Sequence, residues 1–592
     1  MEGGGIDKLT KSFDTVIAAM KKKADRLIQQ RNESAKLGPY EAAITETLAT
    51  ITENGIVPRI WAHDFTVWKP NPAEISNRLG WLHTVEIMQK VLPNTLEVVD
   101  EFREAGFTDA LLLGMGGSSL APQVFMKTFG GREGYLNLSV LDTVDPNSVF
   151  AQSKRLQPSK TLYIVSTKSG STVETLSLMK YFYDQEAFRL GKEATGKQFV
   201  AITDPGSPLA QTADRYHFRA KFLSDPSIGG RYSALSYFGL VPAALLGIDL
   251  ARLLDEALTA MRACDSTAKP TENPAAWLGV ILGELAKAGR DKVTLICSPK
   301  ISSFGDWVEQ LIAESTGKEG KGLLPVVGEP VGPPEVYGND RLFVYMRLEG
   351  DTAHDSAVSM LEAAGQPVFR LELHDTYELG RQFFVWEMAV AIAGYVIGIN
   401  PFDQPNVESA KALARKNVDD YKSRGPLPAA TPDLLSGDVL VYGKVQGGSV
   451  GEALKNFLNQ SEARSYVAIQ AYLEPTSETD KVLSALRRRI RDHYKIATTV
   501  GYGPRYLHST GQLHKGDAGR GLFVQITAQD TRDLHIPDDA GSPISSITFS
   551  VLKQAEALGD QQALISGGRR FIRFHLANID RDLSRLNETL VW

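Results

Sequence analysis

The stretch Leu111-Leu-Leu-Gly-Met-Gly-Gly-Ser-Ser-Leu120 decides the fold class of this chain. Three apolar residues stop at a glycine-rich turn with two serines, which predicts a buried strand, a tight turn and the start of a helix. Glycines at such a turn let the backbone approach a ligand closely. The free N–H groups of the new helix, together with the hydroxyls of Ser118 and Ser119, suit a phosphate group.

A second stretch of the same kind follows as Tyr163-Ile-Val-Ser-Thr-Lys-Ser-Gly-Ser-Thr-Val-Glu-Thr175. It has neither the Walker spacing nor the glycine fingerprint of a dinucleotide site. A helix cap needs one hydroxyl, and this loop offers four beside the cation of Lys168. We therefore expect a phosphate site rather than a simple cap. The hydroxyl residues are Thr167, Ser169, Ser171 and Thr172.

Composition excludes several classes of protein. The chain has 592 residues, 43% of them hydrophobic and 23% charged, which allows several domains with sizeable cores. A net charge of −6 argues against a nucleic-acid surface and against an anionic membrane patch. Two cysteines predict no disulfide framework, and neither a signal pattern nor a long apolar run occurs. We expect a cytoplasmic protein that binds neither nucleic acid nor membranes.

Strands that alternate with helical stretches predict an α/β protein with mainly parallel, doubly wound sheets. We expect a helical N-terminal segment over residues 1–100, an α/β unit over 101–247, a second over 248–425 and a third over 433–592. The N-terminal helices are indicated by apolar periodicity at 17–28 and 81–99. The expected strands are 110–113, 138–141, 161–165, 199–202, 293–297, 323–327, 342–346, 368–373, 439–442, 467–471 and 522–527. Helical stretches are expected at 232–246 and 383–398, and a linker at 424–432.

Five ordered motifs resemble the glucose-6-phosphate isomerase family, which is built from sugar isomerase (SIS) domains. The two glycine- and hydroxyl-rich loops resemble the sugar-phosphate loops of that family. The later motifs are Ile228-Gly-Gly-Arg-Tyr-Ser233, Gln310-Leu-Ile-Ala-Glu-Ser-Thr-Gly-Lys318 and Asn400-Pro-Phe-Asp-Gln-Pro-Asn-Val-Glu-Ser-Ala-Lys411. The region after 430 resembles the tail of fused transaldolase–isomerase proteins, although we find no transaldolase portion before it.

The resemblance implies an aldose–ketose isomerase that interconverts glucose 6-phosphate and fructose 6-phosphate through a cis-enediol(ate), without a metal or a cofactor. Such chemistry needs a carboxylate base, a cation near the developing oxyanion and an anchor for the phosphate. Glu314 is the predicted base, with Gln310 one helical turn earlier on the same face. Arg231 is predicted to stabilise the enediolate, because a guanidinium keeps its charge at working pH.

Two further residues are predicted at the substrate. Gln404 and Lys411 are two helical turns apart, and we expect them to share a helix face. The resemblance places both at the sugar phosphate, with Lys411 counted among the catalytic residues. The complete set of expected binding residues is Gly117, Ser118, Thr167, Lys168, Ser169, Thr172, Gly230 and Gln404.

One family residue is missing from its expected place. The family uses a histidine to open the sugar ring, and it should lie between Glu314 and the strand at 342–346. Residues 326–341 contain no histidine. The segment Tyr506-Leu-His-Ser-Thr-Gly-Gln512 resembles the missing one, so we expect His508 to take this role, with His514 as second choice. In the family this histidine comes from a neighbouring subunit. The third unit is therefore expected to replace a partner, and the chain to be a monomer or a homodimer.

Two other functions stay open at this stage. An isomerase of another phospho- or sulfo-sugar would use the same residue types. A non-catalytic sugar-phosphate sensor would need the hydroxyl loops, but it would not need Gln310, Glu314 and Arg231 together. The third unit is also compatible with a partner-binding module.

Overall fold

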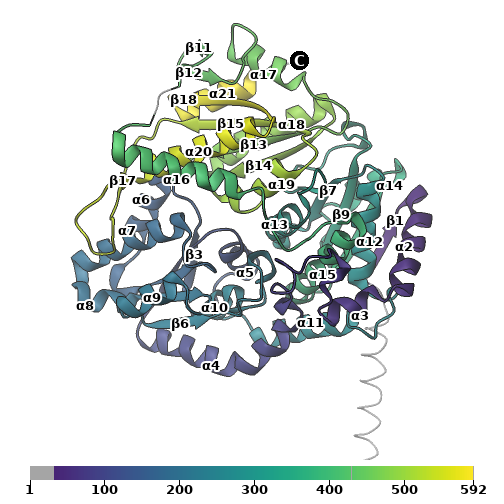
Figure 1. Cartoon of the computed structure of the whole chain (residues 1–592), viewed down its shortest axis with the longest axis horizontal. Coiled ribbons are helices and arrows are strands. Elements are labelled where there is room, and N and C mark those ends of the chain that lie inside the picture. The colour runs from purple at the N-terminus through teal and green to yellow at the C-terminus, as the bar shows by residue number, and fades with distance from the viewer. Residues whose placement is uncertain (1–31, 428–429, 591–592) are drawn as a thin grey trace, which may run out of the picture.

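The computed structural model describes residues 32–427 and 430–590, which form three sheet-based units around a common centre (Figure 1). The first sheet is entirely parallel. In spatial order it consists of β3 (Asn137–Leu141), β2 (Asp109–Gly114), β4 (Thr161–Ser166), β5 (Phe199–Thr203) and β6 (Ala220–Leu223). The first four strands are the predicted ones. The sequence analysis missed β6, because its four residues carry only one buried side chain.

The second sheet has four parallel strands and one antiparallel edge strand. Its order is β8 (Leu324–Val326), β7 (Lys292–Cys297), β9 (Arg341–Leu348), β10 (Val368–Leu373) and β1 (Glu33–Lys36). The four parallel strands were predicted. The polar strand β1 was not, and it pairs the N-terminal region with the edge of this sheet.

The third sheet, drawn in green and yellow in Figure 1, also has four parallel strands. Its order is β14 (Ala497–Tyr502), β13 (Tyr466–Tyr472), β15 (Gly521–Ala528), β18 (Arg570–Leu576), β12 (Val439–Tyr442) and β11 (Leu434–Ser436). The predicted strands β12, β13 and β15 are present, while β11, β14 and β18 were missed.

The three sheets repeat one strand order. Within each unit the parallel strands lie in the order second, first, third, fourth along the chain. This order belongs to doubly wound sheets, whose ligands bind beyond the carboxyl ends of the strands where the order reverses. The sequence shows no strict repeat, yet the chain folds the same arrangement three times.

Helices cover the sheets and fill the space between units. The N-terminal region contains α2 (Glu41–Glu53), α3 (Ile56–Trp61) and α4 (Thr84–Glu104), as expected, while the predicted helix at 17–28 lies outside the described residues. The other helices are α5 (Leu120–Phe129), α6 (Pro146–Arg155), α7 (Val173–Leu190), α8 (Lys192–Thr195), α9 (Pro208–Arg215), α10 (Tyr237–Leu245), α11 (Leu250–Ala263), α12 (Pro274–Lys287), α13 (Phe304–Thr316), α14 (Asp355–Ala363), α15 (Leu379–Ile397), α16 (Glu408–Arg424), α17 (Val450–Leu458), α18 (Ser477–Tyr494), α19 (Gly511–Gly516), α20 (Phe549–Ser566) and α21 (Ile579–Glu588). A small ribbon pairs β16 (His535–Ile536) with β17 (Ile547–Thr548). None of the helices in the described ranges is long and apolar enough to cross a membrane.

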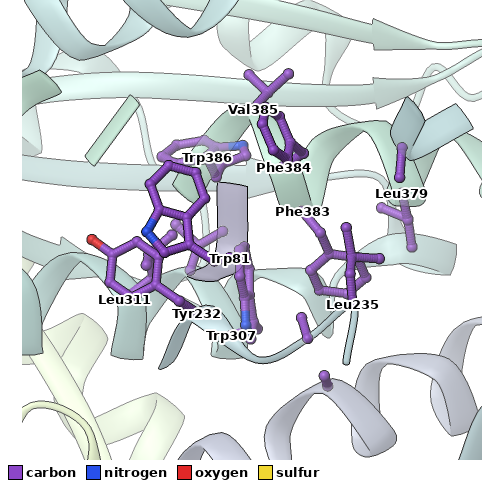
Figure 2. Packing of buried hydrophobic residues seen from close by; sticks show 14 of the residues in the cluster. Trp81, Tyr232, Leu235, Trp307, Leu311, Leu379, Phe383, Phe384, Val385 and Trp386 are labelled. Atoms are coloured by element: carbon purple, nitrogen blue, oxygen red, sulfur yellow. The ribbon is translucent and has the colours of Figure 1, made fainter. Parts of the chain in front are cut away.

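An aromatic core holds α13 in place. Trp81, Trp307, Phe383 and Trp386 are fully or almost fully buried and pack together with Tyr232 (Figure 2). The rings of Trp307 and Phe383 meet edge to face with centroids 4.7 Å apart. Aromatic side chains bury the largest apolar areas of any residues, so this cluster fixes the helix rigidly against α15.

The second and third units share a buried ionic contact. Glu329 is 1% exposed and lies 3.2 Å from Arg341 of its own unit and 3.8 Å from Arg491 of the third. Arg487 donates to the carbonyl of Val327 at 2.8 Å. Burial raises the pKa of Glu329, but the three guanidinium groups outweigh this effect and hold the pKa below its usual range.

At the end of α13 the two units touch backbone to backbone. A Cβ placed on Gly317 would lie 2.3 Å from the Cα of Leu513, although the backbone of Gly317 (φ −77°) suits any residue. Only a residue without a side chain therefore lets α19 pack here.

We expect Gly317→Ala to destabilise the protein by about 1–3 kcal/mol through overpacking, seen as a lower Tm. Gly567→Ala is the matched control, because its Cβ would have 3.2 Å to the nearest atom. Equal Tm values for the two variants would contradict the tight contact.

Candidate active site

The two predicted phosphate loops leave neighbouring strands of the first sheet. β2 is followed by a 3₁₀ turn at Gly116–Ser118 and then α5, and β4 is followed by the hydroxyl loop and then α7. Thr172 is the N-cap residue of α7, but its side chain makes no capping hydrogen bond. Its hydroxyl oxygen lies 2.9 Å from that of Thr167 instead. The structure therefore does not support the simple helix-cap interpretation.

The rest of the hydroxyl loop is held by its neighbours. The backbone N–H of Ser171 donates to Oγ of Ser169 at 3.2 Å. Lys168 forms an ion pair with Asp204 and donates to the carbonyl of Pro226 at 3.1 Å. The ammonium group of Lys168 therefore lies beside the loop and is paired with the carboxylate of Asp204.

The first loop touches both other units. A Cβ on Gly117 would lie 2.2 Å from the carbonyl oxygen of Gly230. A Cβ on Gly116, whose φ is +56°, would lie 2.7 Å from the carbonyl oxygen of His508 and 3.0 Å from Nε2 of Gln310. Glycine is thus required at both positions, which fits the sequence reasoning about this turn.

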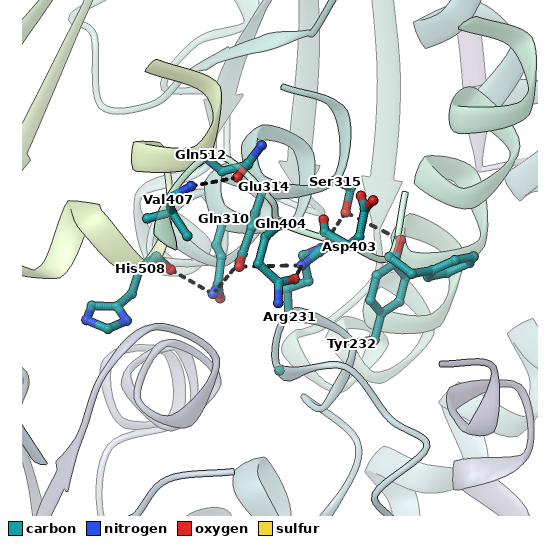
Figure 3. Close-up of polar contacts among 12 residues, drawn as sticks. Arg231, Tyr232, Gln310, Glu314, Ser315, Asp403, Gln404, Val407, His508 and Gln512 are labelled. Carbon is teal, nitrogen blue, oxygen red and sulfur yellow. Dashed lines mark hydrogen bonds and ion pairs between the residues drawn. The ribbon is translucent and has the colours of Figure 1, made fainter. Parts of the chain in front are cut away.

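Gln310 joins the predicted base to the third unit (Figure 3). Its Nε2 donates to Oε2 of Glu314 at 3.0 Å and to the carbonyl of His508 at 2.8 Å. Both side chains lie on one face of α13, as predicted. The side chain of Glu314 is 16% exposed, so its carboxylate stays accessible to a ligand.

Arg231 lies on the other side of Glu314. Its Nη1 is 3.4 Å from Oε1 of Glu314 and donates to Oε1 of Gln404 at 3.0 Å. Its Nε donates to the hydroxyl of Ser315 at 2.7 Å, and its Nη2 donates to the carbonyl of Pro401 at 2.7 Å. The guanidinium is therefore fixed in one orientation, at 3% exposure, against the carboxylate.

The expectation that Gln404 and Lys411 share a helix face is wrong. Helix α16 begins at Glu408, so Gln404 lies in the loop before it. The proline at 405 and the hydrogen bond from Arg231 hold this loop apart from the helix. Lys411 is on α16 and pairs with Glu408 at 3.1 Å.

His508 makes a contact that the sequence analysis missed. Its Nε2 lies 2.5 Å from Oε1 of Glu174 in the first turn of α7. Burial raises the pKa of Glu174, but the imidazole outweighs it and holds the pKa below its usual range. Burial and this carboxylate together raise the pKa of the adjacent Glu556 well above its usual range, so Glu174 is the charged member of the pair. Glu174 lies within the stretch 163–175, just after the hydroxyl loop, and only the fold reveals its partner.

His514, the second choice, is 2% exposed among Tyr466, Tyr506 and Phe523. Burial lowers its pKa well below the usual range, and its Nε2 has no partner among the described residues. It is a core residue of the third unit.

Lys318 was also missed as a site residue. Its side chain is 1% exposed, and its Nζ lies 2.7 Å from Oδ1 of Asp403. Burial, together with the neighbouring Arg231, lowers its pKa to about 8. The motif Gln310–Lys318, which contains Glu314, ends at this lysine, so its place in the motif could have identified it as a site residue. Within residues 32–427 and 430–590, no group of three or more His, Cys, Asp or Glu side chains is arranged to hold a metal ion.

The repeated doubly wound sheets carry two hydroxyl loops and a buried Arg–Glu pair, and the comparisons with known proteins assign this arrangement to the sugar-phosphate isomerases. A family model described as phosphoglucose isomerase matches residues 101–322. A glucose-6-phosphate isomerase of Thermus thermophilus is 30% identical, over 58% of this chain and 91% of that protein. Another from Rubrobacter xylanophilus is 29% identical, over 54% and 85%.

Two solved structures have a similar fold. A hypothetical protein from Thermus thermophilus has a TM-score of 0.55 at 26% identity, covering 65% of this chain and 99% of its own. A glucose-6-phosphate isomerase from Chlamydia trachomatis shares the fold, with a TM-score of 0.53 at 18% identity over 64% and 86% of the two chains. The chain belongs to the glucose-6-phosphate isomerase family.

The lowered pKa of Lys318 predicts a pH dependence of stability. Because the native lysine loses its proton near pH 8 and the unfolded one only near its usual pKa of 10.5, the unfolding free energy should rise with pH between these values. Lys318→Met should remove this rise, of about 1–3 kcal/mol, in urea denaturation series. Lys321→Met is the exposed control, and the same slope in both variants would contradict the assignment.

Proposed function

We propose that this protein interconverts D-glucose 6-phosphate and D-fructose 6-phosphate through a cis-enediol(ate). The observation that carries the proposal is the position of Glu314 between the carboxamide of Gln310 and the guanidinium of Arg231. A carboxylate held between a neutral donor and a fixed cation is suited to moving a proton next to a developing oxyanion.

In this mechanism Glu314 removes the proton from C2 of the open-chain aldose, and the electron pair moves into a C1–C2 double bond. The C1 oxygen takes up negative charge, which Arg231 stabilises. The proton of the O2 hydroxyl passes to the neighbouring O1 oxygen of the cis-enediolate, and Glu314 returns the proton it holds to C1 as O2 becomes the ketone. Charge and protons then balance without a further reactant.

The loops of the first unit are proposed to hold the phosphate. Ser118, Ser169 and Thr172 supply hydroxyls, with Thr167 and Lys168 beside them, and the backbone of Gly117 lies against that of Gly230. Gln404 is proposed to contact the sugar through the amide that Arg231 leaves free. Lys411 is assigned to the same region, because its positive charge is one of those that lower the pKa of the Glu174 carboxyl.

Ring opening is proposed to fall to His508, which its contact with Glu174 orients. Topology supports this role. The segment with the missing histidine connects the second and third strands of the second sheet, and the segment with His508 connects the equivalent strands of the third. The third unit thus repeats the strand order of the second, and we propose that it supplies from the same chain what the family takes from a neighbouring subunit.

We propose further that the chain divides into segments 1–100, 101–247, 248–425 and 433–592. We also propose that its C-terminal region is similar to fused transaldolase–isomerase proteins, and that the protein is a monomer or a homodimer. An isomerase of another phospho- or sulfo-sugar uses the same groups. A sensor is disfavoured, because Gln310, Glu314 and Arg231 form one network that binding alone does not need.

Proton NMR of glucose 6-phosphate in heavy water tests the function directly. We expect exchange at C2 together with the appearance of fructose 6-phosphate. Exchange and product with another sugar phosphate alone would favour the alternative isomerase, and tight binding without exchange would favour the sensor.

We expect Glu314→Gln to lower kcat about a thousandfold, within the range for loss of a general base, while KM changes little. The amide keeps the size of the side chain and its contact with Gln310 but cannot take up a proton. Glu319→Gln, 47% exposed on the following turn, is the control. Near-native C2 exchange in Glu314→Gln would refute the assignment.

His508→Ala separates ring opening from proton transfer. We expect kcat/KM to fall about a hundredfold or more for cyclic glucose 6-phosphate and to stay near wild type for an open-chain erythrose phosphate. His535→Ala, an exposed histidine of the same unit, is the control. Equal losses on both substrates, or no loss on either, would remove the ring-opening role.

A further inference from the structure

A cavity lies in the third unit, at the carboxyl ends of its parallel strands. Its volume is about 280 Å³. The lining residues used below are Tyr442, Tyr472, Thr527, Gln529, Lys553, Arg573 and His575. They come from β12, β13, β15, β18, α20 and the segment after β15, so the cavity spans the point where the strand order reverses. Doubly wound sheets bind their ligands at this place.

Arg573 is a buried charge in this cavity without an anionic partner in the described part of the chain. It is 8% exposed, and its guanidinium lies 4.1 Å from the centre of the Tyr442 ring. Its Nε has no hydrogen-bond partner, and no carboxylate of the described residues forms an ion pair with it. Burial lowers its pKa, and the interaction with the Tyr442 hydroxyl opposes this effect only in part. A buried guanidinium is costly unless an anion pairs with it.

The other basic groups of the cavity do not compete for an anion. Lys553 is paired with Asp145 at 2.8 Å and also with Asp530. Burial lowers the pKa of His575, with Arg573 adding to the effect, so the imidazole is neutral. One of its nitrogens, Nδ1, lies 2.9 Å from the hydroxyl of Thr527, and the other is left for a ligand.

The surroundings of Arg573 are built from donors. Tyr442, Thr527 and Gln529 carry hydroxyl or amide groups, and a guanidinium offers a planar fork that matches two oxygens of one anion. The polarity of these strand positions is unusual, because the opposite face of the same sheet is apolar, with Val524, Ile526 and Ile572 buried. A polar, partly empty face on a buried sheet costs stability unless a ligand uses it.

We propose that this cavity is a second binding site, separate from the isomerase site, for a small oxyanion such as the phosphate or carboxylate group of a metabolite, held by Arg573. The anion pairs with the guanidinium and receives further hydrogen bonds from His575 and Gln529.

The site is connected to the loop that carries His508. Tyr472 lines the cavity, and its hydroxyl oxygen lies 3.2 Å from that of Tyr506. Tyr506 and His508 belong to the same 3₁₀ turn, Arg505–His508. Only the side chain of Tyr472 therefore separates a ligand in the cavity from Tyr506 of that turn.

Calorimetric titration with orthophosphate tests the proposal. We expect Arg573→Met to bind one phosphate per chain fewer than wild type, while Arg488→Met, an exposed arginine of the same unit, matches wild type. A parallel titration with malonate tests whether the site also binds carboxylates. If it does, Arg573→Met loses malonate binding that wild type shows. Equal stoichiometry in wild type and Arg573→Met for both anions would overturn the proposal.

The result does not depend on the isomerase assignment. Phosphate bound at the isomerase site is displaced by excess glucose 6-phosphate and is kept in Arg573→Met. If the isomerase site binds no phosphate, wild type still binds one phosphate per chain more than Arg573→Met.

Without added anion, Arg573→Met should have a Tm at least equal to that of wild type, because the substitution removes an unpaired buried charge. Arg573→Lys keeps the positive charge but loses the planar guanidinium. Its affinity for orthophosphate should fall by about tenfold or more, and an unchanged affinity would also count against the site.

Discussion

The site depends on the approach of three polypeptide segments to within backbone contact. Gly116 and Gly117 of the first unit have no room for a methyl group against His508 of the third and Gly230 of the G-G-R-Y-S turn. Close packing of this kind transmits small displacements, because the interior has few voids in which to absorb them. The positions of Gln310 and Arg231 therefore follow from how the units dock, as much as from the helices and loops that carry them.

Electrostatics at the centre follow from this docking. Arg231 directs its donors to Ser315, Gln404 and backbone carbonyls, so it meets Glu314 in a fixed orientation rather than as a mobile surface pair. Lys318 and Asp403 form a second pair beneath it. In the proposed mechanism, such preorganised groups act on developing charge without rearranging during the reaction.

Sequence reasoning reached the parts of the site that local pattern determines. The turn after β2, the hydroxyl loop after β4 and the Gln310–Glu314 face all follow from strand ends and helical spacing. It placed Gln404 on a helix because spacing alone cannot show that the helix starts at Glu408. The contact between Glu174 and His508 joins residues 334 positions apart, and no local pattern encodes it. Two of the missed strands have a similar cause: β1 and β11 are short and polar or exposed, and they exist only because a neighbouring sheet edge pairs with them.

The third sheet repeats the strand order of the second, and the two units contact each other at Glu329 and Gly317. In this chain both units belong to one polypeptide, joined through α16, which packs along α20. A covalent connection gives the docking partners an effective concentration of about millimolar or more. The assembly of these two units is therefore insensitive to dilution, whereas the same contact made between separate subunits would weaken as the protein became scarce.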